Sequence, residues 1–239
     1  MKFSFGIITS PKSSHYLKKV IKSILKQNIP KDMFEIIVVG SNKTFNSENI
    51  HNIDFDEDEK IGWITRKKNL ITSNSNYENI VYIHDYVALS KGWYKAYLDF
   101  ENDFDICMNP ILNYDDTRYR DWTLWTDNGN KLDNTLSIRD SECLIPYDVT
   151  HLSKFMYISG AYWVAKKKVM EDFPLNEKLS WGEGEDVEWS KRVRKNYEFK
   201  LNPNAKVKLL KYKPPLFLQP NEIKLKQILE ITNQILSKE

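Results

Sequence analysis

The sequence contains few cysteines. Its 239 residues include two, Cys107 and Cys143, and their spacing matches neither a disulfide framework nor a metal-ligand pair. Small extracellular scaffolds stapled by disulfides are therefore excluded. A reducing compartment is expected.

Long apolar runs and a charge excess of either sign are also missing. No run approaches the roughly 18–20 apolar residues that a transmembrane helix needs. The first residues, "MKFSFGIITSPK", resemble a strand more than a signal peptide. Thirty-five basic and thirty-three acidic residues leave a net charge of +2, which argues against a nucleic-acid partner. We expect a cytoplasmic protein without a transmembrane segment, with peripheral contact at the inner membrane face left open.

Two common nucleotide-binding motifs do not occur. The turn after the first predicted strand lacks G-x-G-x-x-G, and G-x-x-x-x-G-K-[ST] is found nowhere. A Rossmann dinucleotide site and a P-loop are therefore both excluded.

What the sequence does contain is an alternation of strand and helix patterns. A hydrophobic content of 41% with 13% aromatic residues is enough for a packed core. The patterns predict strands at 2–9, 34–40, 79–87, 105–108, 156–165 and 207–210, and helices at 17–25, 65–73, 93–100, 166–173 and 185–195. Strand, helix and strand in succession predict an α/β fold with a parallel sheet. We expect one domain over 1–213, followed by a linker and an amphipathic helix over 214–239.

Polar residues follow the predicted strands. Thr9, Ser41 and the His84-Asp85-Tyr86 turn come directly after strands. In open α/β sheets, ligands bind beyond the carboxyl ends of the strands. The sequence therefore predicts a ligand site at this edge.

An acidic cluster stands out in "LSWGEGEDVEWSKRV", residues 179–193. Its four carboxylates are Glu183, Glu185, Asp186 and Glu188. Acids near a helix start commonly do no more than favour the helix dipole and cap free amides. The flanking glycines and tryptophans, taken with the other motifs, favour a reactive site instead.

Four segments together resemble a known enzyme family. "TRKKN", "YIHDY", "ISGAYWVAKKKV" and "WGEGEDVEWSKRV" occur in the order and spacing of inverting glycosyltransferases of family 2, over about 2–210. The resemblance implies a GT-A fold, a mixed and mostly parallel sheet flanked by helices. It also implies transfer of a sugar from a nucleotide-diphosphate donor.

The resemblance assigns the donor side of the site. Lys68-Asn69 matches an Arg-Asn pair that lies under the nucleotide. The acidic residue that contacts the base would fall at 40–42, around Ser41. The metal-binding Asp-x-Asp falls on His84-Asp85-Tyr86, with Tyr86 in place of the last carboxylate. A divalent metal (Mn²⁺ or Mg²⁺) on Asp85 is left open, with weak or no metal dependence expected because the motif is degenerate.

The resemblance also assigns the catalytic and acceptor side. Asp186 matches the general base and Glu185 its neighbour, while Trp181 and Gly182 match the acceptor wall. A general base is needed because an acceptor hydroxyl is a weak nucleophile until its proton is removed.

Two further features belong to the acceptor side. Gly160 stands where a side chain would obstruct something close. The polar segment 113–148 is expected to be an acceptor-side loop. Within it, Trp122 and Trp125 would either stack on sugar rings or anchor the loop in a small core.

The function expected from these features is transfer of a sugar, from UDP as the carrier, to a glycan or lipid-linked acceptor in polysaccharide synthesis. The C-terminal helix is expected to pack on the domain, with a homodimer contact or a membrane-surface contact left open. Two alternatives stay open: a non-catalytic relative that binds a nucleotide or glycan, and a sugar nucleotidyltransferase.

Overall fold

The structure is a computed structural model that describes residues 1–11, 14–40, 47–124, 143–214, 225–227, 229–230, 233–234 and 237. Ser41 and Trp125, both predicted site residues, lie outside the described residues.

The chain begins with the predicted βαβ unit. Strand β1 (Phe3–Ile8) is followed by helix α1 (Leu17–Leu25) and strand β2 (Phe34–Val39). The two strands are buried at every position because both of their faces are covered, and they pair in parallel.

The remaining elements alternate in the same way. The helices are α2 (Ile64–Asn74), α3 (Trp93–Phe100), α4 (Lys167–Asp172) and α5 (Glu185–Val193), with short 3₁₀ turns at Ser14–Tyr16, Lys31–Met33 and Ser153–Phe155. The strands are β3 (Ile50–Ile53), β4 (Asn79–His84), β5 (Val87–Leu89), β6 (Ile106–Met108), β7 (Ile111–Leu112), β8 (Thr123–Leu124), β9 (Cys143–Leu144), β10 (Met156–Tyr157), β11 (Tyr162–Lys166), β12 (Phe199–Leu201) and β13 (Val207–Leu209).

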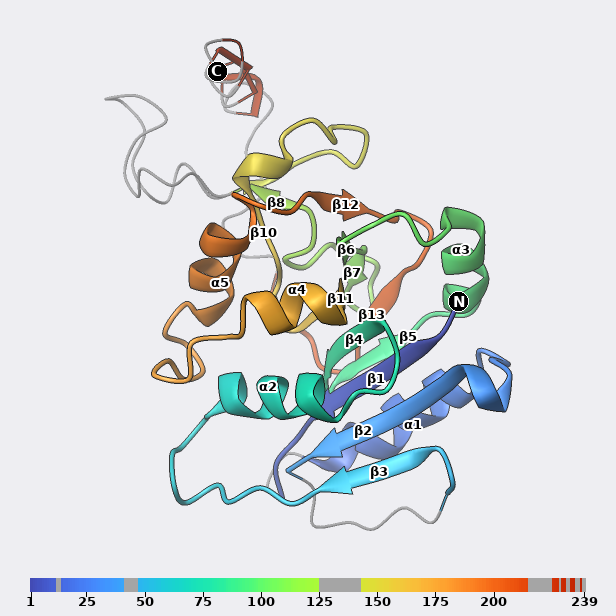
Figure 1. Ribbon diagram of the computed structural model, residues 1–239. Coiled ribbons are helices and arrows are strands. Elements are labelled where there is room, and N and C mark those ends of the chain that lie inside the picture. The colour runs from blue at the N-terminus through green and yellow to red at the C-terminus, as the bar shows by residue number, and fades with distance from the viewer. Residues whose placement is uncertain are drawn as a thin grey trace.

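A seven-stranded sheet forms the centre, in the order β12-β6-β11-β4-β1-β2-β3 (Figure 1). Strand β11 is antiparallel to both of its neighbours, and the other pairings in this sheet are parallel. The predicted mixed, mostly parallel α/β sheet is confirmed. Because β11 runs against β4, its first residues lie beside the last residues of β4, with Tyr162 opposite Ile83.

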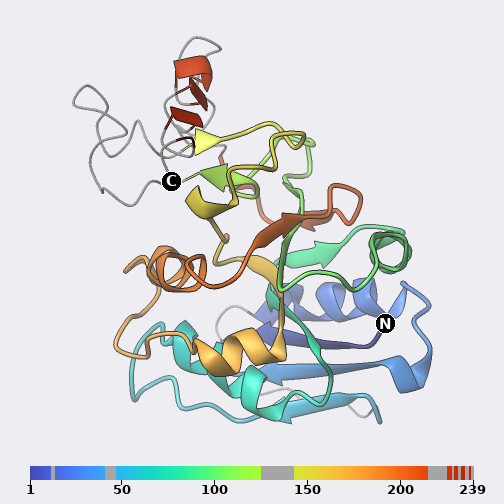
Figure 2. The ribbon, with the colours of Figure 1, turned by 45° about the horizontal axis from the view of Figure 1, so that its top comes forward.

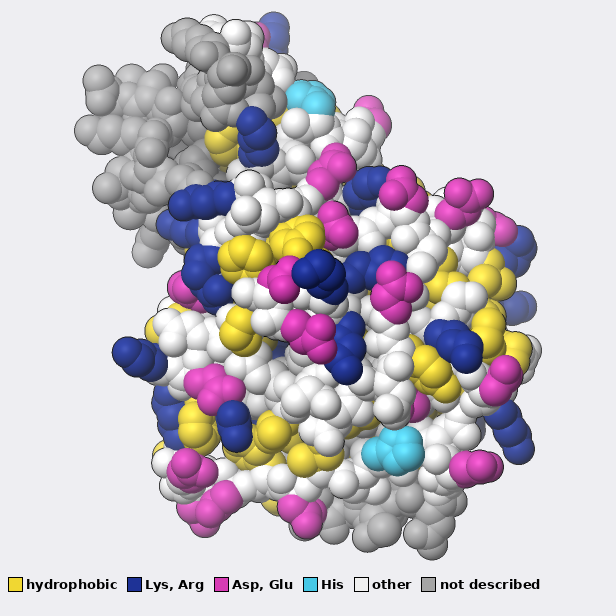
Figure 3. Space-filling view, in the orientation of Figure 1, with side chains coloured by type: hydrophobic (Ala, Val, Ile, Leu, Met, Phe, Trp, Pro, Cys, Tyr) yellow, Lys and Arg dark blue, Asp and Glu magenta, His cyan; other side chains and the backbone are white. Residues whose placement is uncertain are grey.

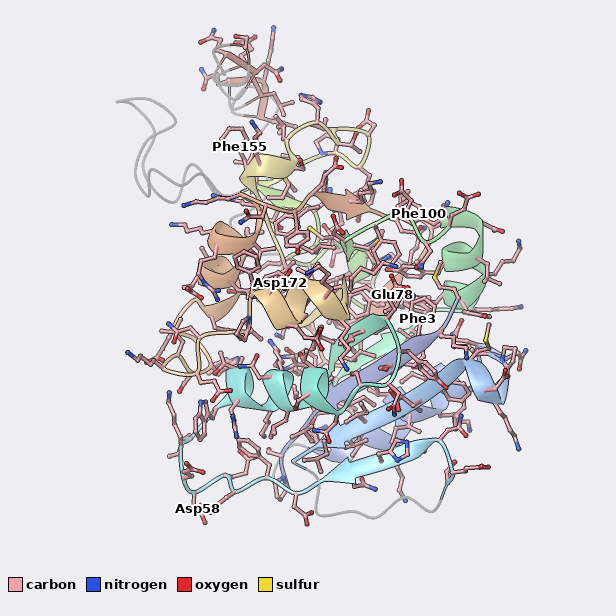
Figure 4. All side chains as sticks on the ribbon, in the orientation of Figure 1. Phe3, Asp58, Glu78, Phe100, Phe155 and Asp172 are labelled. Carbon is pink, nitrogen blue, oxygen red and sulfur yellow. The ribbon has the colours of Figure 1, made fainter. Side chains whose placement is uncertain are left out.

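Helices cover both faces of this sheet. Helices α1 and α3 pack into one hydrophobic cluster, while α2, α4 and α5 pack into the other. Figures 1 and 2 show α1 on one side of the strands and α2 with α4 on the opposite side. Aromatic rings fill the first cluster, where Phe3 lies 5.1 Å from Trp93 and 5.4 Å from Tyr97. Figure 4 labels Phe3 near α3 and Asp172 at the end of α4.

Two small sheets extend the molecule beyond the central one. One has the order β10-β8-β9 and the other β5-β13-β7. The second joins the residues after β4 to the last described strand, since β13 pairs with β5. It therefore brings residues near 210 beside the end of β4.

Several predicted strands differ in detail. The run 79–87 divides into β4 and β5 at the Asp85-Tyr86 turn, and 156–165 divides into β10 and β11 around Gly160. Strands β3 (IHNI) and β12 (FKL) were not predicted, because they are the edge strands of the sheet and polar residues interrupt their apolar runs.

The surface carries both signs of charge. On the face shown in Figure 3, Lys and Arg side chains are interspersed with Asp and Glu. Within the described ranges, no helix combines the length and apolar character needed to cross a bilayer. Near the C-terminus, Leu225 and Leu229 pack against the second hydrophobic cluster, and the domain boundary near 213 stays a prediction.

Candidate functional site

A pocket of about 360 Å³ opens where β4 ends and β11 begins. It collects residues from five stretches of the chain: His84, Tyr86, Tyr119, Arg120, Ser159, Gly160, Ala161, Trp181, Gly182, Gly184, Glu185, Asp186, Val187 and Lys213. Seven of these were predicted site residues. The pocket therefore unites the donor, catalytic and acceptor motifs of the sequence.

Asp186 lies in the first turn of α5, directly behind a glycine that turns the chain. Gly184 has a φ of +74°, a conformation that suits glycine. The backbone N–H of Gly160 donates to Asp186 Oδ2 at 2.9 Å, and the N–H of Val187 donates to Oδ1 at 2.9 Å. Two backbone donors therefore fix the orientation of this carboxylate at the pocket wall.

Gly160 leaves no room for a side chain. A Cβ atom there would lie 2.9 Å from Glu185 Oε1 and 3.0 Å from Asp186 Oδ2. The sequence expectation that a side chain at this position would obstruct something close is confirmed. What it would obstruct is the pair of carboxylates.

Lys68 lies beneath the carboxylates. Its side chain is 1% exposed, and its ammonium donates to the carbonyl of Gly160 at 2.9 Å and lies 4.0 Å from Glu185 Oε1. Burial lowers the pKa of Lys68, against the opposite pull of Glu185 and Asp186. Burial likewise raises the pKa of Glu185, which Lys68 counteracts. Lys68 therefore balances Glu185 from inside the protein and does not line the pocket.

Trp181 and Gly182, which were predicted to lie on the acceptor side, also line the pocket. Trp181 is 71% exposed, and its backbone N–H donates to the carbonyl of Gly62 at 2.9 Å. Gly182 follows with a φ of +85°. The hydroxyl of Thr65 donates to the carbonyl of Leu179 at 2.7 Å, which ties this loop to α2. An aromatic face is thus held open to solvent beside Asp186.

Basic side chains from two segments, Arg120 and Lys213, also line the pocket. The Lys213 ammonium donates to the hydroxyl of Tyr86 at 2.7 Å and to that of Tyr119 at 3.5 Å. Lys211 lies over the Tyr86 ring, with its Nζ 3.9 Å from the centroid. Burial lowers the pKa of Lys213 to about 8, with Lys211 and Arg120 contributing and Asp186 opposing.

His84 lies between these groups and the carboxylates. Burial first, and then the charges of Lys68, Lys213 and Lys211, hold its pKa well below the usual value. The imidazole is therefore neutral at pH 7 and adds no positive charge to the pocket.

A buried acid holds Tyr119 and Arg120 in place. Asp121 accepts hydrogen bonds from Arg118 Nη2 at 2.6 Å and from the Tyr147 hydroxyl at 2.6 Å. These contacts join the two described ends of the polar segment, 113–124 and 143–148. Because Tyr119 and Arg120 lie between Arg118 and Asp121, the contacts fix them at the pocket.

Thr9 and Asp85 lie together at the strand ends but outside the pocket lining. The hydroxyl of Thr9 donates to Asp85 Oδ2 at 2.6 Å, and both residues are buried. Lys67 donates to the Thr9 carbonyl at 2.6 Å and pairs with Glu57. The predicted donor residues Thr9 and Asp85 thus form a polar floor next to the pocket.

The described residues around Asp85 do not form a site that fits a divalent cation. Among the described residues, no group of three or more His, Cys, Asp or Glu side chains could hold a metal ion. The Asp85 carboxylate already accepts a hydrogen bond from Thr9. At Tyr86, where the resemblance places a carboxylate, the nearest charge is the ammonium of Lys213.

Two predicted residues lie elsewhere. The Asn69 amide bonds to Leu175 and to Glu177, in a separate shallow groove. Trp122 is fully buried, with its indole N–H donating to the Val149 carbonyl at 2.7 Å. Of the two interpretations offered for Trp122, its surroundings match a loop anchor.

Seven of the fourteen pocket residues were not among the predicted site residues, and Tyr119, Arg120 and Lys213 are the ones with large polar side chains. The available signal was the alternation of basic and aromatic residues in "RYR" at 118–120 and "KYK" at 211–213. Such patterns are common on solvated surfaces, and only the fold brings these two together.

Comparison with known proteins identifies the fold. No family model matches the sequence, and no curated protein is detectably similar to it. Residues 1–349 of S. aureus TarS in complex with UDP-GlcNAc give a TM-score of 0.61 at 16% identity, covering 97% of this chain and 65% of that chain. GalNAc-T7 with UDP, GalNAc and Mn²⁺ gives a TM-score of 0.64 at 12% identity, covering 96% of this chain and 48% of that chain.

The chain spans less than two thirds of the length of either structure. At 16% and 12% identity, the similarity to these two structures shows a shared fold and nothing more specific. The chain has the GT-A-like fold of the glycosyltransferases TarS and GalNAc-T7.

Proposed function

We propose that the protein is an inverting glycosyltransferase that uses a UDP-sugar, with Asp186 as the general base. The observation that carries the proposal is the pocket itself. A fixed carboxylate on α5 and a basic cluster around Lys213 line the same 360 Å³ cavity at the ligand edge of a GT-A-like sheet. The similar structures contain UDP or UDP-GlcNAc, which supports UDP as the carrier.

The proposed chemistry is a single displacement. The acceptor hydroxyl attacks the anomeric carbon and gives its proton to Asp186 as the new C–O bond forms. The bond to the β-phosphate breaks on the opposite side, and its electron pair stays on the departing UDP. Attack from the side opposite the leaving group inverts the configuration of the sugar.

Glu185 and Trp181 have supporting roles in this proposal. Glu185, balanced by Lys68, would face hydroxyls of the donor or the acceptor. Trp181 would stack against the apolar face of the acceptor sugar, because flat aromatic rings suit that surface. The acceptor is a glycan or a lipid-linked glycan.

The nucleotide would lie along the carboxyl ends of β1, β2 and β4. Thr9 and Asp85 form the described part of this edge, beside the buried ammonium of Lys67. Ser41 follows β2 on the same edge in sequence and stays a prediction.

Asp186→Asn tests the proposal, because asparagine keeps the size of aspartate but cannot accept the proton. The measurement is release of UDP from a panel of UDP-sugars, with water as the acceptor. General-base assistance is worth about 10²–10⁴-fold, so a loss of that order is expected. UDP affinity by calorimetry should stay within about twofold, because the carboxylate does not bind the nucleotide.

Glu188→Gln is the matched control. Glu188 lies in the same helical turn but pairs with Arg192 at 2.6 Å and does not line the pocket. Its removal should leave UDP release unchanged. An Asp186→Asn variant that releases UDP at the wild-type rate would contradict the base assignment.

A second candidate follows from the poor fit of a metal ion. A non-catalytic relative would bind UDP and a glycan through the same pocket without transfer. If the wild-type chain binds UDP but releases none from any UDP-sugar, with or without Mn²⁺, that candidate is favoured.

A further inference from the structure

The segment after β13 is fastened to the end of β4 and to the polar segment 113–124. The backbone N–H of Leu210 donates to the Tyr86 carbonyl at 2.8 Å. The N–H of Lys213 donates to Asn113 Oδ1 at 2.9 Å, and Asn113 Nδ2 donates to the Lys213 carbonyl at 2.7 Å. Asn113 is fully buried. The backbone of Lys213 is therefore held on both sides, which fixes where its side chain begins.

The side chain of Lys213 lines the pocket. It bonds to the hydroxyls of Tyr86 and Tyr119, and its Nζ lies 4.4 Å and 4.9 Å from the centroids of their rings. Within the described residues it makes no ion pair. Two other cationic groups, Lys211 and Arg120, are close enough to lower its pKa. Lys213 and Arg120 thus bring positive charge to the pocket from two distant segments, with Lys211 over the Tyr86 ring, and such charge attracts an anionic ligand.

These cations lie near Tyr86, the predicted metal position, where the described residues do not support a metal ion. Tyr86 stands where the resemblance puts a metal-binding carboxylate, and the Lys213 ammonium lies 2.7 Å from its hydroxyl. A divalent cation there would be repelled by Lys213. The positive charge at this place therefore comes from the chain itself.

We propose that Lys213, with Arg120 and Lys211, neutralises the diphosphate of the donor and takes the place of a divalent cation. This inference rests on the proposed function, because it assumes a nucleoside-diphosphate donor. When the bond between the anomeric carbon and the β-phosphate oxygen breaks, its electron pair adds one negative charge to the departing UDP. The ammonium donates a hydrogen bond to that oxygen, while the acceptor proton goes to Asp186.

Calorimetric titration with UDP and with uridine tests the inference, each in EDTA and in Mn²⁺. Uridine lacks the diphosphate and therefore reports only the nucleoside part of the site. For the wild-type chain, the UDP dissociation constant should agree within about twofold between EDTA and Mn²⁺.

Lys213→Met should raise the UDP dissociation constant by about 10–100-fold, the range of a charge-assisted hydrogen bond. The uridine dissociation constant should stay unchanged. Unchanged uridine affinity also shows that the variant is folded. Arg120→Met is an independent variant on another segment, and it should also raise the UDP dissociation constant. Lys208→Met is the control, because Lys208 lies on β13 but pairs with Asp116 at 2.8 Å. It should bind UDP like the wild type.

The possible failures are distinguishable. UDP binding that is lost in EDTA and restored by Mn²⁺, or that is unaffected in both Lys213→Met and Arg120→Met, overturns the inference and leaves the proposed function standing. A wild-type chain that binds neither UDP nor uridine overturns both.

Discussion

At the scale of single residues, Gly160 controls the geometry of two side chains from another part of the chain. Its N–H holds Asp186, its carbonyl accepts from Lys68, and the space above its Cα is filled by carboxylate oxygens. This glycine is required for a close approach rather than for an unusual backbone angle.

Gly160→Ala should therefore impair chemistry more than folding. The added methyl group would displace both carboxylates by a few tenths of an ångström or more, and overpacking of this kind costs roughly 1–3 kcal/mol. We expect UDP release from a UDP-sugar to fall at least about tenfold, since small misplacements of a reacting group have large effects. Urea unfolding measures the stability change.

Gly92→Ala is the comparison for Gly160→Ala. Gly92 has a φ of +83° with open space around its Cα, so alanine there strains the backbone far from the pocket. It should lower stability without lowering the rate per folded molecule. Equal rates for the two variants would contradict the steric role of Gly160.

The charge of Lys213 also predicts that the affinity for UDP depends on pH. Lys213 is charged below its pKa of about 8 and neutral above it. UDP keeps its charge over pH 7–9, because the last phosphate pKa is about 6. The UDP dissociation constant should therefore rise by up to about tenfold from pH 7 to pH 9, as the ammonium loses its proton.

Lys213→Arg should remove this pH dependence, because a guanidinium stays charged over the whole range. The other groups that face Lys213 are Tyr86, Tyr119, Lys211, Arg120 and Asp186. Burial raises the pKa of Tyr86, so its hydroxyl stays neutral. A wild-type affinity that is flat from pH 7 to pH 9 would argue against diphosphate binding by Lys213.

At the scale of elements, α2 and α5 meet through a buried pair. Lys68 on α2 reaches Glu185 on α5 and the Gly160 carbonyl before β11. Removing one member of a buried pair leaves the other charge uncompensated and typically costs about 3–5 kcal/mol. Lys68→Met should therefore lower the free energy of unfolding by about this amount, measured in urea.

Two variants test the cause of that loss. Lys68→Met combined with Glu185→Gln should recover part of it, because no unpaired carboxylate remains. Arg66→Met on the same helix removes an exposed pair with Glu177 and should cost no more than about 1 kcal/mol. A double variant no more stable than Lys68→Met would show that lost packing, not charge, is the cause.

The sequence predicted most elements because apolar runs are strong signals when both faces of a strand are buried. Strand β2 and helix α1 fall at or within one residue of their predicted bounds. Short edge elements such as β3 and β12 gave no pattern of their own. The turn at His84-Asp85-Tyr86 was predicted, whereas the break of 156–165 into two strands around Gly160 was missed, although it carries Gly160 to the pocket.

For the site, sequence motifs located the carboxylates better than the cations. Asp186 and Glu185 belong to a contiguous pattern with flanking glycines. Arg120 and Lys213 lie far apart in the sequence and meet through the pairing of Asn113 with the backbone of Lys213, which no local pattern reports. Lys68 was predicted beside the nucleotide, whereas its burial places it beneath Glu185.

At the scale of the whole molecule, ligand binding should be visible as stability. A ligand that binds only the folded state at 100 times its dissociation constant stabilises that state by about 2.7 kcal/mol. For a chain of this size, that corresponds to a rise in melting temperature of roughly 5–10 °C. Thermal unfolding with UDP should show this shift in EDTA as well as in Mn²⁺.

Inorganic phosphate at the same concentration is the control for a general ionic effect and should shift the melting temperature less. Absence of a shift with UDP at millimolar concentration would count against a nucleoside-diphosphate site.

The reversed strand β11 has a consequence for synthesis on the ribosome. Strand β4 pairs with β1 on one side and with β11 on the other, and β11 lies much later in the chain. At about 5–20 residues per second, the roughly 80 residues from His84 to Lys166 take about 4–16 s to emerge. During that interval the nascent N-terminal half has an open edge along β4, and open edges are templates for pairing with other chains. The strand that follows Gly160 is thus also the one that covers the open edge of β4.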